Sequence, residues 1–221
     1  GGVFVTPVNA GDNMICALRK DDENAGLSLA FFETVKDKFQ IPAIMCTDYE
    51  TFKHINLPII EVENISQALY QMAGFVRDSY NGKVVAITGS AGKSTTTGIC
   101  YEALKRYGAD GNINKANTVF GLSWNMTDYD ISVPYWVNEV SLNKGMYPSA
   151  RLVRPDVAVI TNVAPVHLKT NETLETVAQL KSRIFTDMSE GSIAVLNKDM
   201  EYFDVAFSAA KAKGLNILTF G

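Results

Sequence analysis

The sequence lacks a long hydrophobic run, has few cysteines and carries little net charge. No apolar stretch reaches the roughly 18 residues that a membrane-spanning helix needs. The three cysteines (Cys16, Cys46 and Cys100) are odd in number, widely spaced and without a CxxC pair. We therefore expect free thiols in a reducing compartment and neither a disulfide framework nor a cysteine metal site. A formal net charge of −4 gives no sign of the basic surface that binds nucleic acid.

The sequence also lacks internal repeats, low-complexity tracts and a recognisable signal peptide. Its first residues, GGVFVTPV, contain no charged segment followed by an apolar stretch. We therefore expect a cytoplasmic protein without a membrane span. The composition, 47% hydrophobic and 20% charged over 221 residues, is that of a globular protein long enough for one or two cores.

From residue 83 onward, short apolar segments alternate with segments of helical periodicity. We predict strands at 83–88, 135–140, 156–161, 192–197 and 215–220, with helices at about 93–107, 146–153, 172–189 and 199–212. Several of these strands are almost continuously apolar, as expected for strands that are covered on both faces. This alternation predicts βαβ units and a mostly parallel sheet.

The first 80 residues have a different pattern. Short strands (VFVTPV, NMICAL, PAIMCT and PIIEVE) surround a helix near 27–39, and a second helix runs from about Ile65 to Tyr80. Asn64 and Gln67 have the spacing of a capping box before this second helix, and the turn Asn81-Gly82 follows it. We therefore predict an α/β protein with a small α/β domain at 1–81 and a P-loop, mostly parallel-sheet domain at 82–221.

The strongest local motif lies between a predicted strand and a predicted helix. Small residues there let backbone N–H groups surround phosphate oxygens at a helix N-terminus, where a lysine and a hydroxyl can reach phosphate and Mg²⁺. The full Walker pattern has glycine at position 87, where this chain has Ile87, so a glycine-rich turn without a ligand is the alternative. We predict a nucleotide-binding loop of Gly89, Ser90, Ala91, Gly92, Lys93, Ser94 and Thr95.

Polar residues follow two other predicted strands. Glu139 lies near the end of YWVNEV, and Asn162 and His167 follow DVAVIT. The carboxyl ends of parallel strands share one edge of a sheet, and ligands bind at that edge. Glu139 is thus a candidate Mg²⁺ ligand, with a solvated strand end as the alternative. His167 is either a site residue or a structural histidine.

Lys181 is out of place on its predicted helix. It falls in phase with the apolar residues Val177, Ile184 and Met188. A lysine at such a position extends its amine to solvent, pairs with another group or is chemically altered.

Taken together, these segments resemble the Mur ligase family, the ATP-dependent amide ligases of peptidoglycan synthesis. The resemblance is nearest to the member that adds D-alanyl-D-alanine to a UDP-muramoyl-tripeptide. It rests on several motifs in the same order: GDNMICALRKDDENAG, ALYQMAGFVRDSYNGKVVAITGSAGKSTTT, GNIN, NEVSLNKG, RPDVAVITNVAPVHL and TVAQLKSRIF.

The resemblance implies a role for each matching residue. Lys93 would contact the β- and γ-phosphates of ATP, and Ser94 with Glu139 would hold one Mg²⁺ while His167 helps to hold a second. Lys181 would react with CO₂ to form an anionic carbamate near the metals. The implied nucleotide and substrate contacts also include Asn112, Asn114 and Asn162. The substrates would be a carboxylate acceptor and an amino acid or dipeptide amine, joined through an acyl phosphate.

Three departures from the family pattern leave alternatives open. Val140-Ser141 follows Glu139 where the family has a glycine, and Val5-Thr6-Pro7 stands where the family has a Ser-Arg pair for a uridine nucleotide. The chain ends at LTFG, so we expect the rest of the ATP domain and the amine-binding third domain to come from elsewhere. A ligase for a capsule, storage-polymer or secondary-metabolite acceptor, a non-catalytic nucleotide-binding module and a simple P-loop kinase are the competing hypotheses.

Overall fold

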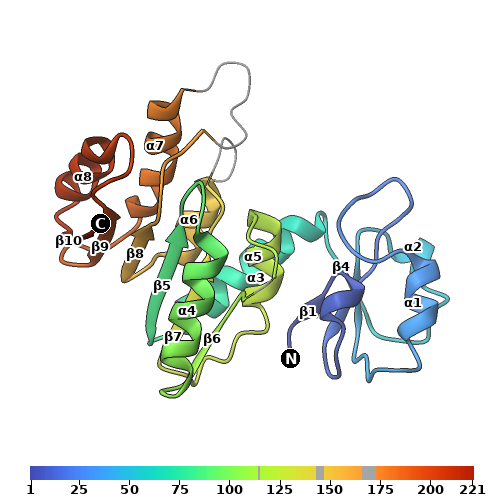
Figure 1. Ribbon diagram of the computed structural model, residues 1–221. Coiled ribbons are helices and arrows are strands. Elements are labelled where there is room, and N and C mark those ends of the chain that lie inside the picture. Colours follow the sequence, from blue (N-terminus) through green and yellow to red (C-terminus); the bar gives the residue numbers. More distant parts are fainter. Residues whose placement is uncertain (114, 143–146, 166–172) are drawn as a thin grey trace. The chain divides into compact units, whose positions relative to one another are not determined.

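The computed structural model describes residues 1–113, 115–142, 147–165 and 173–221 (Figure 1). The chain divides into two compact units, Gly1–Val76 with Ser123–Tyr129 and Arg77–Leu122 with Asp130–Gly221. Each unit contains an all-parallel sheet and helices, which confirms the predicted α/β class. No local pattern in the sequence assigns residues 123–129 to the first unit. In the described part of the chain, no helix is both long and apolar enough to cross a membrane.

The first unit is built on a four-stranded sheet in the order β1-β2-β3-β4. Polar side chains begin its helices: the Ser28 hydroxyl accepts from the Phe31 N–H, and the Asn64 Oδ1 atom accepts from the Gln67 N–H across 2.9 Å. The second contact is half of the predicted capping box. The elements are β1 (Val3–Phe4), η1 (Pro7–Asn9), β2 (Ile15–Ala17), α1 (Leu29–Val35), β3 (Ile44–Cys46), α2 (Tyr49–Phe52), β4 (Ile59–Glu61) and α3 (Ile65–Ser79).

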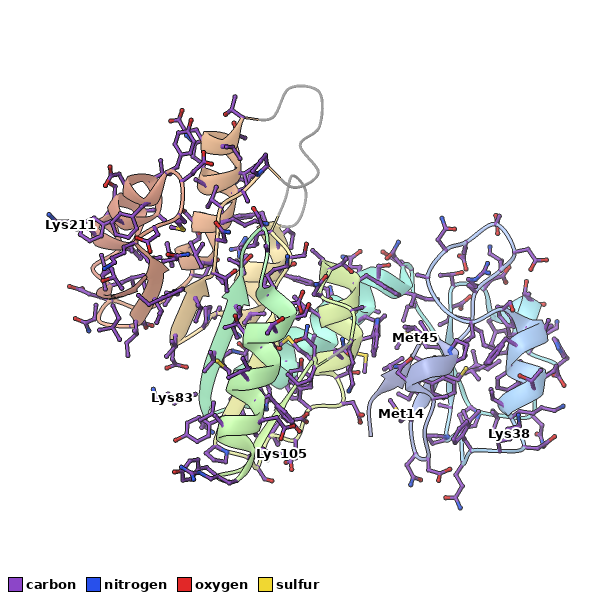
Figure 2. All side chains as sticks on the ribbon, viewed as in Figure 1. Met14, Lys38, Met45, Lys83, Lys105 and Lys211 are labelled. Atoms are coloured by element: carbon purple, nitrogen blue, oxygen red, sulfur yellow. The ribbon has the colours of Figure 1, made fainter. Side chains whose placement is uncertain are left out.

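The core of the first unit is apolar and includes two thiols. Met14 and Met45 lie in its interior, whereas the labelled lysines project from the molecular surface (Figure 2). Cys16 and Cys46 are free and buried, and burial raises the pKa of the Cys16 thiol to about 12. Because the reactive form of cysteine is the thiolate, Cys16 acts as a core residue and not as a nucleophile.

The second unit is built on a six-stranded sheet in the order β10-β9-β8-β5-β7-β6. All five strands predicted for this region are present. The additional edge strand β6 is short and polar, so it has no apolar pattern of its own and depends on its pairing with β7. The strands are β5 (Lys83–Thr88), β6 (Ala109–Gly111), β7 (Tyr135–Glu139), β8 (Val157–Ile160), β9 (Ile193–Asn197) and β10 (Asn216–Phe220).

The four helices predicted for the second unit are present with shorter spans, and α5 (Val119–Met126) is an additional helix that was not predicted. The segment predicted as one helix to residue 189 contains an α-helix followed by a 3₁₀ turn, and the last helix begins later than predicted because Tyr202 has a φ of 56°. Figure 1 shows α4 in front of β5 and β7, and α7 beside α8. The elements are α4 (Lys93–Lys105), α5 (Val119–Met126), which continues into the first unit, α6 (Tyr147–Val153), α7 (Leu174–Ser182), η2 (Arg183–Phe185) and α8 (Phe203–Ala212).

The position of β5 determines where a ligand can bind. The chain passes from β5 out to the edge strand β6, returns to β7 beside β5, and then crosses to β8 on the other side of β5. This reversal of direction is a topological switch point, and in open parallel sheets the ligand crevice lies outside the carboxyl ends of the strands at such a point. The loops that follow β5, β7 and β8 therefore meet at one edge.

Candidate nucleotide-binding and catalytic site

The phosphate loop connects β5 directly to α4. Its four residues, Gly89–Gly92, lie between Thr88 at the end of the strand and Lys93 at the start of the helix. Gly89 and Gly92 have φ values of +153° and +78°, which side-chain-bearing residues rarely adopt. Ala91 and Gly92 are exposed. The loop thus presents backbone at the N-terminus of a 13-residue helix, where N–H groups and the helix dipole favour an anion.

Thr161, which directly follows β8, holds the phosphate loop through hydrogen bonds. Its hydroxyl donates to the carbonyl oxygen of Ala91 across 2.6 Å, and its N–H donates to that of Thr88 across 3.0 Å. Next to it, the Asn162 carbonyl accepts from the Ser90 N–H across 2.8 Å. A Cβ atom on Gly89 would lie 2.0 Å from the Thr161 hydroxyl oxygen. The loop shape is therefore fixed by β8 as well as by its own glycines.

Thr161 was not among the site residues predicted from the sequence. The signal was present, because Thr161 immediately precedes Asn162 at the end of an apolar strand. Its role needed the pairing of β8 with β5, which no local pattern supplies. A further contact, from the Asn197 side-chain amide to the Thr161 carbonyl across 3.1 Å, links the end of β9 to the same support.

Lys93 lies over the loop that it is predicted to serve. Its Nζ atom donates to the carbonyl oxygen of Gly89 across 2.9 Å. Ser94 and Thr95 occupy the first turn of α4 and are exposed. The lysine amine therefore contacts the loop and the two hydroxyl residues are open to solvent, and their ligand contacts remain predictions.

Glu139 is the last residue of β7 and is buried, with 8% of its surface exposed. The side chain of Asn112 holds its backbone from both sides: Oδ1 accepts from the Glu139 N–H across 2.7 Å, and Nδ2 donates to the Glu139 carbonyl across 2.9 Å. Asn112 is itself 1% exposed. Its observed contacts position Glu139, and the nucleotide contact implied by the family resemblance remains a prediction.

The Glu139 carboxylate has a neutral hydrogen-bond partner. The amide nitrogen of Asn117 donates to its Oε1 atom. A carboxylate is a suitable ligand for Mg²⁺, which prefers oxygen atoms and commonly binds through one or two carboxylates together with phosphate. Within the described residues, no three His, Cys, Asp or Glu side chains form a metal cluster. This donor set fits a Mg²⁺ that binds together with ATP.

Lys181, on α7, points toward the loop that follows Glu139. It is 9% exposed, and its Nζ atom donates to the Leu142 carbonyl across 2.8 Å. Burial, with the charge of Lys93 as a second cause, lowers the pKa of Lys181 to about 8. The helix therefore does not extend this amine into bulk solvent. It brings the amine to the edge of the sheet where Lys93 and Glu139 lie.

Two predicted site residues, Asn114 and His167, lie outside the described part of the chain. Their contacts with nucleotide and metal therefore remain predictions. Among the described residues, Lys93, Glu139, Asn162 and Lys181 belong to segments that meet at the carboxyl edge of the sheet.

A polar cavity of about 280 Å³ lies at the opposite edge of the sheet, beside the starts of β5, β8 and β9. Its lining includes Arg77, whose guanidinium already donates to the carbonyl oxygens of Val153 and Arg154. None of the predicted site residues lines this cavity, so the cavity is not part of the candidate site.

Comparisons with known proteins agree with this arrangement. Residues 87–221 match the family model described as the Mur ligase middle domain. The UDP-N-acetylmuramoyl-tripeptide–D-alanyl-D-alanine ligase of Rickettsia prowazekii is 31% identical over 174 residues, which are 74% of this chain and 37% of that protein. The corresponding ligase of Buchnera aphidicola subsp. Baizongia pistaciae is 31% identical over 150 residues, which are 66% of this chain and 33% of that protein.

Solved structures show the same fold. The MurF ligase of Thermotoga maritima, in complex with ADP, superimposes with a TM-score of 0.75 and 25% identity over 100% of this chain and 50% of that one. A MurF structure from Acinetobacter baumannii gives a TM-score of 0.79 and 20% identity over 99% of this chain and 48% of that one. The chain thus spans about a third to a half of the length of these relatives. Since the family model covers more than half of the chain, the chain belongs to the Mur ligase family, and residues 87–221 correspond to its middle domain.

Proposed function

We propose that this chain binds ATP and Mg²⁺ as part of a ligase that joins a carboxylate to an amine, of the MurF type. One observation carries the proposal. The buried amine of Lys181 bonds to the loop that follows Glu139 and lies close enough to Lys93 for that charge to lower its pKa. A phosphate-binding lysine, a buried carboxylate and a buried amine of lowered pKa together suit a ligase better than a simple phosphate-binding loop.

The phosphate loop would position ATP. Backbone N–H groups of Gly89–Gly92 and the first turn of α4 would hold phosphate oxygens, and Lys93 would move from the Gly89 carbonyl to the β- and γ-phosphates. Ser94 and Glu139 would bind one Mg²⁺, with His167 at a second. When bound, Mg²⁺ neutralises phosphate charge, which is much of what phosphoryl transfer requires.

The reaction would take place in two steps. An oxygen of the acceptor carboxylate attacks the γ-phosphorus, and the bond to the bridging oxygen of ADP breaks, which leaves an acyl phosphate. The substrate amine then attacks the acyl carbon. Inorganic phosphate leaves with the bonding electrons, and the nitrogen loses a proton to give the amide. For a ligase of the MurF type, the two substrates would be a UDP-muramoyl-tripeptide and D-alanyl-D-alanine.

Lys181 would serve this site as a carbamate. At pH 7.5 a pKa of about 8 leaves roughly a quarter of the side chains as the neutral amine, the form that attacks CO₂. The neutral nitrogen bonds to the carbon of CO₂ and releases one proton, which gives an anion with two oxygen atoms. Counted from the ammonium form, two protons leave and a cation becomes an anion. This change removes a positive charge that would repel Mg²⁺.

The proposal is tested by ADP release from ATP and Mg²⁺ in bicarbonate buffer, with the full-length gene product. We expect release when UDP-muramoyl-tripeptide and D-alanyl-D-alanine are both present, and little release with either one alone. ATP binding without ADP release from this pair would contradict the MurF-type assignment and favour another acceptor or a binding role.

A further inference from the structure

The loop between β6 and α5 is attached to the end of β7 at more than one point. The Asn117 carbonyl accepts from the Ser141 N–H across 3.0 Å, while the Asn117 side chain reaches the Glu139 carboxylate. Asn112 at the start of the same loop holds the Glu139 backbone. The backbone of Glu139 and that of Ser141 are therefore held in place, and the remaining freedom is in the glutamate side chain itself.

Asn117 restrains the orientation of the Glu139 side chain. Its Nδ2 atom lies 2.5 Å from Glu139 Oε1, and among the described residues it is the side chain that bonds this carboxylate. Asn117 is half-buried, so the contact is partly shielded from water. A carboxylate bonded at one oxygen has a defined orientation for its other oxygen, Oε2.

The chemistry of the donor matters as much as its position. An amide nitrogen donates a hydrogen bond without carrying charge, so it orients the carboxylate without pairing it with a cation. A lysine or arginine at position 117 would also orient the carboxylate but would compete with Mg²⁺ for it. Hydrogen-bond partners of this kind orient metal ligands and tune their affinity.

We propose that Asn117 is a positioning residue that holds Glu139 Oε1, so that Oε2 faces the nucleotide-bound divalent cation. This inference rests on the proposed function, because it takes Glu139 as a metal ligand. It assigns Asn117 to the site through Glu139 and not through contact with the nucleotide.

The test uses Mn²⁺ as a spectroscopic probe for the Mg²⁺ site. Binding of Mn²⁺ to the full-length protein in the presence of ADP is measured by electron paramagnetic resonance, together with metal-free ADP binding in EDTA and thermal unfolding. The variants are Asn117→Ala and Asn117→Leu, the second of which keeps side-chain volume without the donor. The matched control is Asn216→Ala on the distant strand β10, which removes a hydrogen bond from a side-chain amide to the carbonyl oxygen of Gly191.

We expect both Asn117 variants to bind Mn²⁺ about tenfold more weakly than wild type, the range for loss of a partner of a metal ligand. Metal-free ADP binding should stay at the level of the Asn216→Ala control. Unchanged Mn²⁺ binding in both variants would overturn the proposal, and so would an equal loss of metal-free ADP binding, which would indicate general damage to the site.

The Glu139→Gln variant distinguishes the role of Glu139 as a metal ligand from the role of Asn117 as its positioning residue. If wild type and Glu139→Gln bind Mn²⁺ with ADP equally well, the assignment of Glu139 as a metal ligand fails, and with it the proposed function of this residue. If Glu139→Gln loses Mn²⁺ and the Asn117 variants do not, only the role of Asn117 fails.

Discussion

Lys181 and Leu142 are joined by a 2.8 Å hydrogen bond from the lysine amine to the leucine carbonyl. The contact connects α7 to the loop after β7. It places the buried amine of Lys181 at the carbonyl oxygen of Leu142, which lies three positions after Glu139 in the sequence. Burial of an ammonium is costly, and the lowered pKa of Lys181 reflects that cost.

Lys181→Ala should abolish most of the ligase activity. Loss of the proposed carbamate is expected to lower turnover by about 10- to 100-fold, and short carboxylic acids such as acetate should restore part of it by supplying the missing carboxylate. Steady-state ADP release measures both effects. The control is Lys211→Ala, which removes an exposed lysine from α8 (Figure 2). Full activity of Lys181→Ala would contradict the carbamate role.

The lowered pKa of Lys181 predicts a pH dependence of stability. Its usual pKa is 10.5 and its folded-state value is about 8, so above pH 8 the folded state loses this proton before the unfolded state does. Stability should therefore rise with pH between about 8 and 10.5, and the full penalty should be present below pH 8.

This dependence is measured by urea unfolding in CO₂-free buffer. Lys181→Met is the reference, because it contains every other titratable group of the wild-type protein. Between pH 7 and 9.5, the unfolding free energy of wild type should rise by about 2 kcal/mol relative to Lys181→Met. A difference between the two proteins that is constant with pH would show that Lys181 has an ordinary pKa.

Thr161→Val should weaken nucleotide binding while leaving the fold intact. The valine keeps the shape but removes the hydroxyl that bonds to the Ala91 carbonyl, so the phosphate loop loses one of its contacts with the end of β8. The loss of one such bond is about 1 kcal/mol, which corresponds to roughly a fivefold to tenfold rise in the Kd for ADP. Isothermal titration calorimetry checks this, and Thr161→Ser should bind as wild type does. Equal binding by Thr161→Val and wild type would remove Thr161 from the site.

Gly89→Ala should damage the loop for a steric reason. Its Cβ would lie 2.0 Å from the Thr161 hydroxyl oxygen, and its φ of +153° is unfavourable for alanine. We expect a loss of ADP binding beyond detection and a lower Tm. Gly98→Ala in α4 is the matched control, because nothing lies within 4 Å of its Cβ position and alanine favours helix. Its Tm should be equal to or higher than that of wild type, and a drop in Tm as large as that of Gly89→Ala would contradict the steric argument.

The periodic parts of the fold were predictable from the sequence. The strands that contain Val84 and Ala158 have apolar patterns that can be read without knowledge of the tertiary structure, and the glycines of the phosphate loop indicate its turn. In contrast, β6 could not be predicted, because Ala109–Gly111 becomes a strand only by pairing with β7.

The candidate site was predictable in its reactive residues and not in the residues that hold them. Lys181 was visible as a phase anomaly, and Lys93 as part of a motif. Asn117 and Thr161 were not, because an asparagine in a loop and a threonine at a strand end have many roles, and theirs depend on contacts 22 and 70 residues away in the sequence. Positioning contacts of this kind come from the fold.

The central claim, amide formation through an acyl phosphate, is tested most directly by oxygen transfer. The acceptor carboxylate is labelled with ¹⁸O and supplied with ATP, Mg²⁺ and the amine to the full-length gene product. Because a carboxylate oxygen attacks the γ-phosphorus, the released phosphate should carry one ¹⁸O atom per amide formed, as measured by mass spectrometry. Unlabelled phosphate, with all ¹⁸O retained in the acceptor or its product, would contradict the account.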